Sequence, residues 1–110
     1  MRSENHKYYL FDAYIDSGAD ISLFTKSDCI LLGHNLEKGR EKLIGGVSGS
    51  LIRTYIHKIP VRLGEDEFRA EIAFAELDEV PRLLGRKNAF EHFRILFDEK
   101  IKRVYFIPRK

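Results

Sequence analysis

The sequence is poor in the features that crosslink a chain or anchor it in a membrane. Its 110 residues include one cysteine, Cys29, so no disulfide can form within the chain, and this favours a reducing, cytoplasmic compartment. No run approaches the roughly 18 consecutive apolar residues of a membrane-spanning helix, and the apolar stretch after residues 1–7 is too short and too charged for a secretory signal. Charge is balanced, with 19 Lys and Arg against 17 Asp and Glu, so no nucleic-acid or membrane-surface partner is expected.

What the chain has in quantity is apolar and charged residues in the proportions of a folded domain. Hydrophobic residues make up 44% and charged residues 33%, which excludes a disordered tail, a collagen-like chain and a coiled-coil rod. The length suits one domain spanning residues 1–110, large enough to fold without staples but with little core to spare. Self-association would therefore help it.

Short apolar and β-branched segments separated by turn residues predict an all-β fold. Strands are expected over 8–15, 42–44, 51–63 and 68–75, with further apolar runs at 21–24 and 83–84 and a final hairpin joining 95–97 to 101–107. Within 68–75, apolar residues alternate with other residues, which predicts a strand with one buried face. Seven or eight such strands favour a small closed or sandwiched β structure.

Two short helices complete the prediction. The first covers 25–32, because Thr25 is a good N-cap, Asp28 follows it in a capping-box arrangement and Gly33 can end the helix. The second covers one or two turns between 87 and 93.

Three motifs suggest where chemistry occurs. The turn Asp16-Ser17-Gly18-Ala19 follows an apolar strand, and alone it is a common β-turn. The other two are the glycine-rich hairpin over 42–49 and the step at 83–86, where two leucines precede Gly85. In this order and at these spacings, the three motifs resemble those of the retropepsins, single-domain aspartic proteases that work as homodimers. The resemblance runs from about residue 9 to residue 97.

The resemblance implies a small closed acid-protease β-barrel with one or two short helices and a glycine-rich flap hairpin. Asp16 is then the catalytic aspartate, Ser17 supplies the hydroxyl that bonds across the dimer axis, and Gly18 lets the substrate backbone lie close. Peptide or protein is the implied substrate, with a homodimer as the active form and no cofactor or metal.

The resemblance assigns the remaining site residues as well. Residues implied to contact substrate are Ala19, Asp20, Gly45, Gly46, Val47, Val80, Pro81 and Leu83. Val47 matches the flap tip, and Gly45 a flap residue that bonds substrate backbone. Arg86, next to Gly85, gives structural support, and the resemblance implies a buried salt bridge between Arg86 and Asp20.

Acid–base chemistry supports an aspartate pair independently. Peptide hydrolysis needs a base to activate water and an acid to protonate the leaving amine. Two carboxyls about 3 Å apart cannot both ionise, so they share one proton and fill both roles. Because the chain has one Asp-Ser-Gly turn, a two-fold dimer would have to supply the second carboxyl.

The sequence departs from the retroviral pattern in three places. Only 15 residues precede Asp16, the segment before the flap carries the additional helix over 25–32, and the chain continues into a later hairpin. These features are closer to cellular and prokaryotic retropepsin-like domains, and they leave the contribution of the termini to a dimer open.

Two alternatives to an active protease remain at this stage. An inactive member of the same fold would serve as a dimerisation or peptide-binding module. A nucleic-acid-binding barrel would rest on the basic residues between 100 and 110. The four histidines and Cys29 lack the spacing of a metal site, and no phosphate-binding or dinucleotide-binding glycine motif is present.

Overall fold

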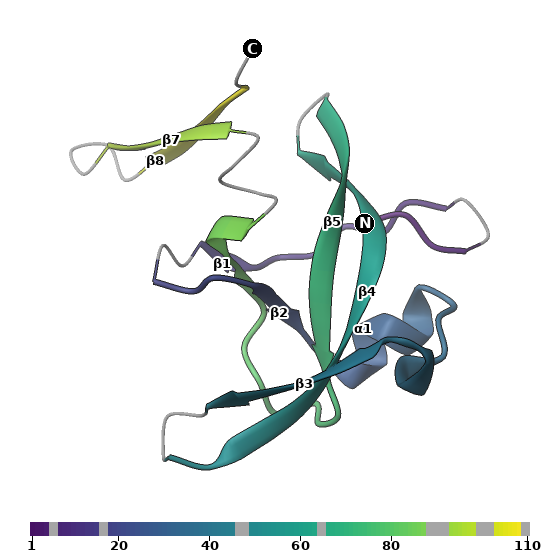
Figure 1. Ribbon diagram of the computed structural model, residues 1–110. Helices are drawn as coiled ribbons and strands as arrows, with labels where there is room; N and C mark the ends of the chain where they lie inside the picture. The colour runs from purple at the N-terminus through teal and green to yellow at the C-terminus, as the bar shows by residue number, and fades with distance from the viewer. Residues whose placement is uncertain are drawn as a thin grey trace.

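The computed structural model describes residues 1–4, 7–15, 18–45, 49–63, 66–87, 93–98 and 103–108, the last two ranges as backbone alone. Its elements are β1 (Tyr14–Ile15), β2 (Ser22–Phe24), α1 (Lys26–Leu31), the 3₁₀ helix η1 (Leu36–Lys38), β3 (Arg40–Gly45), β4 (Leu51–Leu63), β5 (Asp66–Ala75), β6 (Leu83–Leu84), β7 (Phe93–Asp98) and β8 (Arg103–Pro108). The described residues thus confirm a mostly β fold with few helices (Figure 1).

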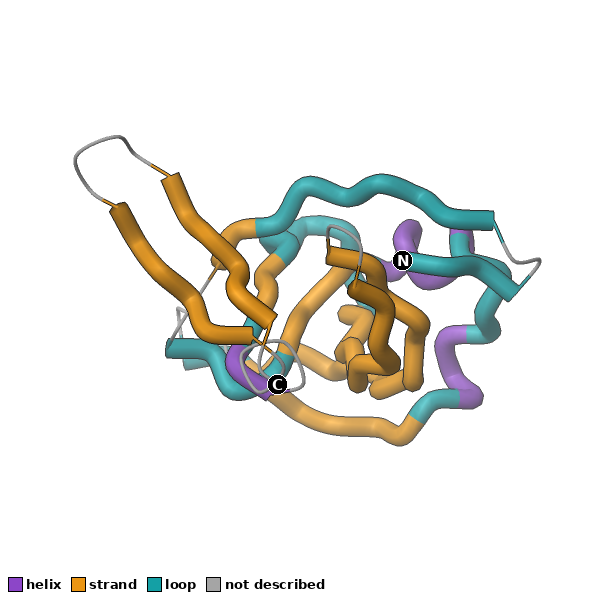
Figure 2. Tube along the Cα trace, turned by 90° about the horizontal axis from the view of Figure 1, so that it is seen from above, coloured by secondary structure: helices purple, strands orange, loops and turns teal. Residues whose placement is uncertain are grey.

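Six of these strands form one mixed sheet in the order β1-β6-β2-β5-β4-β3. The sheet is open, with β1 and β3 at its edges, so the expected closed barrel is not what the described residues form. Strands β7 and β8 pair with each other in the hairpin expected near the C-terminus, and Figures 1 and 2 show this hairpin beside the main sheet.

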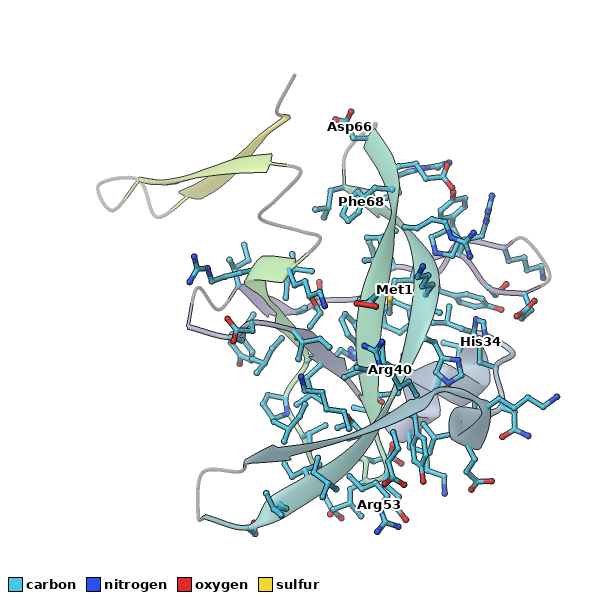
Figure 3. The ribbon with its side chains drawn as sticks, in the orientation of Figure 1. Met1, His34, Arg40, Arg53, Asp66 and Phe68 are labelled. Carbon is cyan, nitrogen blue, oxygen red and sulfur yellow. The ribbon has the colours of Figure 1, made fainter. Side chains whose placement is uncertain are left out.

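The long antiparallel pair of β4 and β5 is the centre of the sheet. Its register runs from Thr54 opposite Ala75 to Leu63 opposite Asp66. One face packs on the larger core cluster, whose buried members are Met1, Phe24, Cys29, Leu32, Leu36, Ile59, Val61, Ala70, Ile72 and Phe74. Figure 3 shows Met1 against the middle of this strand pair and Phe68 near its upper end.

The opposite face of the same strands carries a second, smaller cluster. Its buried members are Leu23, Ile56, Ala73 and Ala75. The prediction that β5 has one buried face is therefore wrong for the second half of the strand. Ala73 and Ala75 are buried there in the smaller cluster, on the face opposite that of Ile72 and Phe74. Alanines at those positions leave room for the larger side chains that cover this face.

Helix α1 covers the face of the larger cluster and begins as the sequence predicts. The Thr25 side chain accepts a hydrogen bond from the Asp28 backbone N–H at 3.1 Å, and the Asp28 carboxylate accepts one from the Thr25 N–H at 3.1 Å. This capping box satisfies two backbone groups that the first turn otherwise leaves open. Gly33 follows the helix with φ of 82°, a left-handed conformation that glycine adopts without strain.

The segment before β1 is less regular than predicted. The strand expected over 8–15 is reduced to Tyr14–Ile15, with Tyr8 in an isolated bridge to Arg2. Aromatic residues of this segment pack on the core instead of joining the ladder: the Phe11 ring meets the Phe24 ring edge-on at 5.6 Å between centroids. Aromatic residues favour strands because they pack well there, and here the same packing is reached without a strand.

The helix expected over 87–93 lies largely outside the described residues, and Phe93 itself begins β7. Among the described residues, no helix is long and apolar enough to cross a membrane.

Candidate functional site

The connection that carries the Asp16 motif joins two strands on either side of β6. β1 pairs with β6 in parallel, with Tyr14 opposite Leu83, and β2 pairs with β6 antiparallel, with Leu23 opposite the same leucine. The chain leaves β1 at Ile15 and enters β2 at Ser22. Asp16 and Ser17 lie outside the described residues, as do Gly46 and Val47 of the flap motif.

Gly85, directly after β6, fits tightly against the end of this connection. A Cβ added at Gly85 would lie 2.6 Å from the carbonyl carbon and oxygen of Ile21 and 2.9 Å from the Ala19 oxygen. The Gly85 N–H donates to the Ser22 hydroxyl at 3.0 Å in a buried position. Only glycine allows this approach, so the Leu-Leu-Gly motif is explained by contact with the turn motif.

The expected salt bridge between Asp20 and Arg86 is absent: both side chains are exposed, and none of the ion pairs among the described residues joins them. Backbone bonds join the two segments instead. The Arg86 N–H donates to the Ala19 oxygen at 2.8 Å, and the Lys87 N–H donates to the Asp20 oxygen at 2.7 Å. Backbone bonds of this kind need no particular side chain, so the charges at 20 and 86 stay in solvent.

A half-buried apolar surface lies on the face of the smaller core cluster. We call it the apolar wall; its residues are Ile21, Ile44, Ile52, Val80 and Leu83. They come from the connection after Asp16, from the hairpin of β3 and β4, and from the segment 76–84. The wall brings together Val80 and Leu83, which the sequence singled out, with the hairpin of β3 and β4. Pro81 is exposed and does not belong to it.

The sequence prediction missed the three isoleucines of the wall. Ile44 and Ile52 lie opposite each other in the register of β3 and β4, so the two isoleucines share one face of that hairpin near its tip. The signal was present as two isoleucines placed symmetrically about the glycine-rich tip.

The glycine-rich hairpin is present as the paired strands β3 and β4, and its tip, 46–48, is outside the described residues, so its role as a flap stays a prediction. Gly45 ends β3 in an exposed position, and a Cβ added there would have no neighbour within 4 Å. At the base of the hairpin the buried Thr54 hydroxyl donates to the Lys42 oxygen at 2.7 Å. The hairpin is therefore held at its base and open on one side near Gly45.

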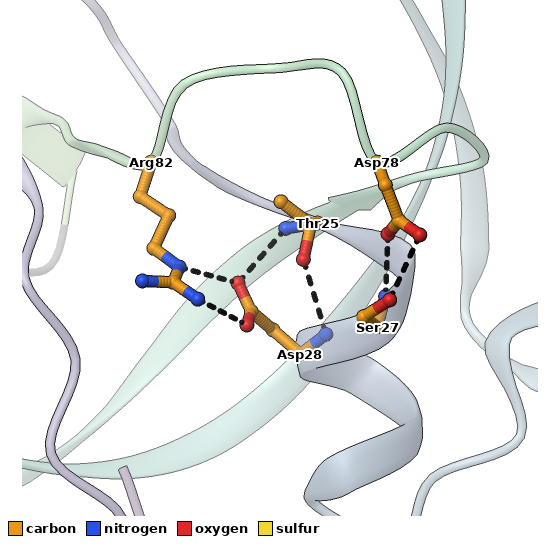
Figure 4. A network of polar contacts seen from close by, with 5 residues as sticks. All are labelled: Thr25, Ser27, Asp28, Asp78 and Arg82. Atoms are coloured by element: carbon orange, nitrogen blue, oxygen red, sulfur yellow. Dashed lines mark hydrogen bonds and ion pairs between the residues drawn. The ribbon is translucent and has the colours of Figure 1, made fainter.

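The loop 76–82 reaches the wall from helix α1, to which two side-chain contacts join it (Figure 4). Arg82 donates from Nε and Nη2 to the two carboxylate oxygens of Asp28, each at 2.9 Å. Asp78 accepts from the Ser27 N–H at 2.9 Å and from its hydroxyl at 2.8 Å. The Asp28 hydrogen bonds raise the pKa of Arg82, and the Ser27 hydrogen bonds lower the pKa of Asp78.

A pocket of about 350 Å³ opens where this loop meets β1. It is lined by Asp12, Ala13, Tyr14, Thr25, Val80 and Arg82. Tyr14 is largely exposed here, 73% by area, beside its register partner Leu83. The pocket thus adjoins the apolar wall through Val80, which lines it, and through Tyr14, whose register partner is Leu83.

An ionic network on β5 joins the hairpin base to the segment after β6. Glu71 accepts from Lys87 at 3.0 Å and lies 3.6 Å from Arg40. These cations lower the pKa of Glu71, with the Lys87 hydrogen bond as the largest cause. No group of three His, Cys, Asp or Glu side chains within the described part of the chain could hold a metal ion.

The chain matches no protein-family model, and no curated protein matches it. Solved structures are similar to it, among them the following three. EIAV protease, complexed with the inhibitor HBY-793, aligns with a TM-score of 0.53 and 26% identity over 67% of this chain and 68% of that chain. A retropepsin-like aspartic protease from Rickettsia conorii aligns with a TM-score of 0.54 and 25% identity over 77% of this chain and 65% of that chain, less than two thirds of its length.

The third similar structure is the retroviral protease-like domain of Ddi1 from Leishmania major. It aligns with a TM-score of 0.60 over 87% of this chain and 83% of that chain, at 20% identity. At this identity the likeness concerns the fold, and it extends over more of the chain than the other two alignments do.

Proposed function

Because this chain resembles the retropepsin-like proteases in fold, we propose that it is an aspartic endopeptidase that works as a homodimer. In this proposal Asp16 from each of two copies forms the catalytic pair, with Ser17 and Gly18 completing each active-site turn. The substrate is an extended peptide or a loop of a protein.

One observation carries the proposal: β6 lies between β1 and β2, and Gly85 packs against Ala19 and Ile21. This arrangement fixes both ends of the short connection that contains Asp16. A catalytic carboxylate must be held to within about half an ångström of its productive place, which requires such anchoring from rigid elements.

The proposed chemistry needs two carboxyls with one proton between them. The ionised one takes a proton from water, which attacks the peptide carbonyl, while the protonated one donates to the carbonyl oxygen. The C–N bond then breaks as the nitrogen of the leaving amine receives a proton from the pair. Activity should therefore be bell-shaped in pH, because neither the doubly protonated nor the doubly ionised pair can do both steps.

In this proposal the peptide lies along the described residues of the wall and the turn. Side chains of the peptide would pack on the apolar wall at Val80 and Leu83, beside Pro81. The backbone of the peptide would lie along Ala19, Asp20 and the flap residues. A Cβ added at Gly45 would meet nothing within 4 Å, so a peptide backbone could approach Gly45 closely, and in the proposal Gly46 and Val47 close over the peptide.

Cleavage of an unfolded protein at acidic pH, with a statine-type inhibitor as probe, tests the proposal. Asp16→Asn should reduce kcat by at least about 10³-fold, because an amide serves neither as base nor as acid. Asp66→Asn is the matched control, since Asp66 is an exposed aspartate at the beginning of β5, and it should cleave as the unaltered chain does. A folded, dimeric chain that cleaves nothing would instead favour the inactive peptide-binding module.

A further inference from the structure

We infer that helix α1 sets the position of the apolar wall, and that Arg82 and Asp78 are the positioning residues through which it acts. This inference rests on the proposed function in so far as the wall receives substrate side chains. The two contacts of Figure 4 are together called the clamp: Asp28 with Arg82, and Ser27 with Asp78.

Arg82, the residue before Leu83 in the chain, contacts three parts of the molecule. Its guanidinium binds Asp28 with two hydrogen bonds, and its carbonyl oxygen accepts from the Tyr14 N–H at 2.9 Å. Its guanidinium also lies 5.2 Å from the centre of the Phe11 ring. The next residue, Leu83, belongs to the apolar wall. The placement of Arg82 therefore constrains where Leu83 can lie.

The Asp28 end of this contact is rigid. The Asp28 side chain is 3% exposed and also accepts from the N–H of Thr25, so its carboxylate oxygens are directed by the start of the helix. A two-pronged bond between guanidinium and carboxylate fixes orientation as well as distance. Arg82, with a side chain 39% exposed, is thereby held from the inside of the molecule.

Asp78 holds the loop four residues earlier, so that Val80 lies between the two contacts. The hydrogen bonds from Ser27 lower the pKa of Asp78, and its carboxylate stays ionised to more acidic pH than an ordinary aspartate. The contact would thus persist in the acidic range where a carboxyl pair works. Between these two contacts, Val80 packs with the wall and lines the pocket beside β1.

Strand pairing alone gives this region little support. β6 has two residues and β1 has two, against 13 in β4. The contacts with α1 hold this region in place, as the hydrogen bonds between longer strands would otherwise do. Weakening these contacts should change which substrate side chains the wall accepts, with little change in the stability of the whole domain.

The test replaces Asp78 with alanine and compares it with Glu79→Ala. Both are exposed acidic residues of the same loop, and Asp78 is the one that contacts α1. Asp28 itself is unsuitable, because its loss would also remove the helix cap. Arg82→Gln is a stronger second variant, but it leaves the buried Asp28 carboxylate unpaired.

Amide hydrogen exchange, measured residue by residue on the full chain, gives a readout that requires no peptidase activity. Exchange at Tyr14, whose N–H is bonded to Arg82, should become about 3–10-fold faster in Asp78→Ala, the range expected from the net loss of about one ordinary hydrogen bond. Amides of the β4–β5 pair should not change. Glu79→Ala should exchange as the unaltered chain does at both places.

Peptide cleavage gives the second readout, with two substrates that differ only in the size of one apolar side chain. Asp78→Ala should alter the ratio of kcat/KM between them about 3–10-fold through KM, with kcat for the better substrate unchanged. Unchanged exchange at Tyr14, or equal effects of Asp78→Ala and Glu79→Ala, would overturn the inference. Altered exchange in a chain that cleaves neither substrate would support the clamp and count against the proposed function alone.

Discussion

Two regions of this molecule are built in opposite ways. The β4–β5 pair has strands of 13 and 10 residues, and core side chains cover both of its faces. The region around Asp16 has strands of two and three residues. A few individual contacts hold these strands, such as the bond from Gly85 to Ser22 and the bond from Arg82 to Asp28. Stability should therefore depend mainly on the first region, and the proposed activity on the second.

The largest expected loss is in the long pair. Phe74→Ala removes a fully buried ring that packs against Phe24 and His57, and it should lower the free energy of unfolding by about 3–5 kcal/mol. Urea unfolding measures this, with Phe68→Ala, half-buried on the same strand, as the milder comparison. A loss below that of Phe68→Ala would contradict the placement of Phe74 in the core of this strand pair.

Gly85→Ala is the sharpest change in the short-strand region. Its Cβ would meet backbone atoms of Ile21 at 2.6 Å, and such overpacking should cost about 1–3 kcal/mol. Gly45→Ala is the control, since a Cβ there meets nothing within 4 Å, and it should unfold as the unaltered chain does. If both variants unfold alike, the close approach of Gly85 to the turn is not part of the fold in solution.

A pH effect should come from His34, beside the long pair. Burial lowers the pKa of His34, with a smaller lowering from His57, while Glu4 at 3.3 Å opposes it. The unfolded chain therefore binds this proton more readily, so the free energy of unfolding should fall as pH drops through about 6.5. Urea unfolding between about pH 8 and about pH 5 measures the slope, which His34→Gln should reduce. An unchanged slope in that variant would assign the pH dependence to other groups.

Cys29 offers a test of whether the larger core opens together with the long pair. Its side chain is fully buried, and burial raises the pKa of the thiol to about 11. A thiol reagent should therefore label it only as fast as the whole domain unfolds. Labelling that outpaces exchange of the β4–β5 amides would show that α1 opens on its own.

The smallest effect is expected at the surface of the hairpin. Arg53 lies 3.7 Å from Glu41 and 4.0 Å from Glu76, with all three side chains about half exposed. Arg53→Ala should change the free energy of unfolding by less than about 1 kcal/mol, because solvent screens such pairs. A larger loss in thermal unfolding would mean that this edge of the sheet contributes more than its exposure suggests.

The sequence predicted the elements whose signals are local. Thr25 and Asp28 marked the beginning of α1, and the apolar run 51–63 coincides with β4. Both follow from neighbouring residues alone, through a cap or through strand-forming composition.

What the sequence did not predict depends on contacts between distant segments. The bond between Asp28 and Arg82 joins residues 54 positions apart, and nothing in either neighbourhood distinguishes Arg82 from Arg86. Arg86 was expected to pair with Asp20, but the arginine that binds a buried carboxylate is Arg82, with Asp28 as its partner. The sequence marks Asp28 as a capping residue, but that it is buried beside Arg82 follows only from the fold.

The central claim, that two copies of Asp16 form one catalytic centre, is tested most directly by mixing. Unaltered chain at fixed concentration is equilibrated with increasing amounts of Asp16→Asn, and peptide cleavage is measured. If a mixed dimer is inactive, a ninefold excess of the variant should lower activity to about one tenth, the share of unaltered chains that still pair with each other. Activity that stays constant at every excess, in a preparation shown to exchange subunits, would contradict the account.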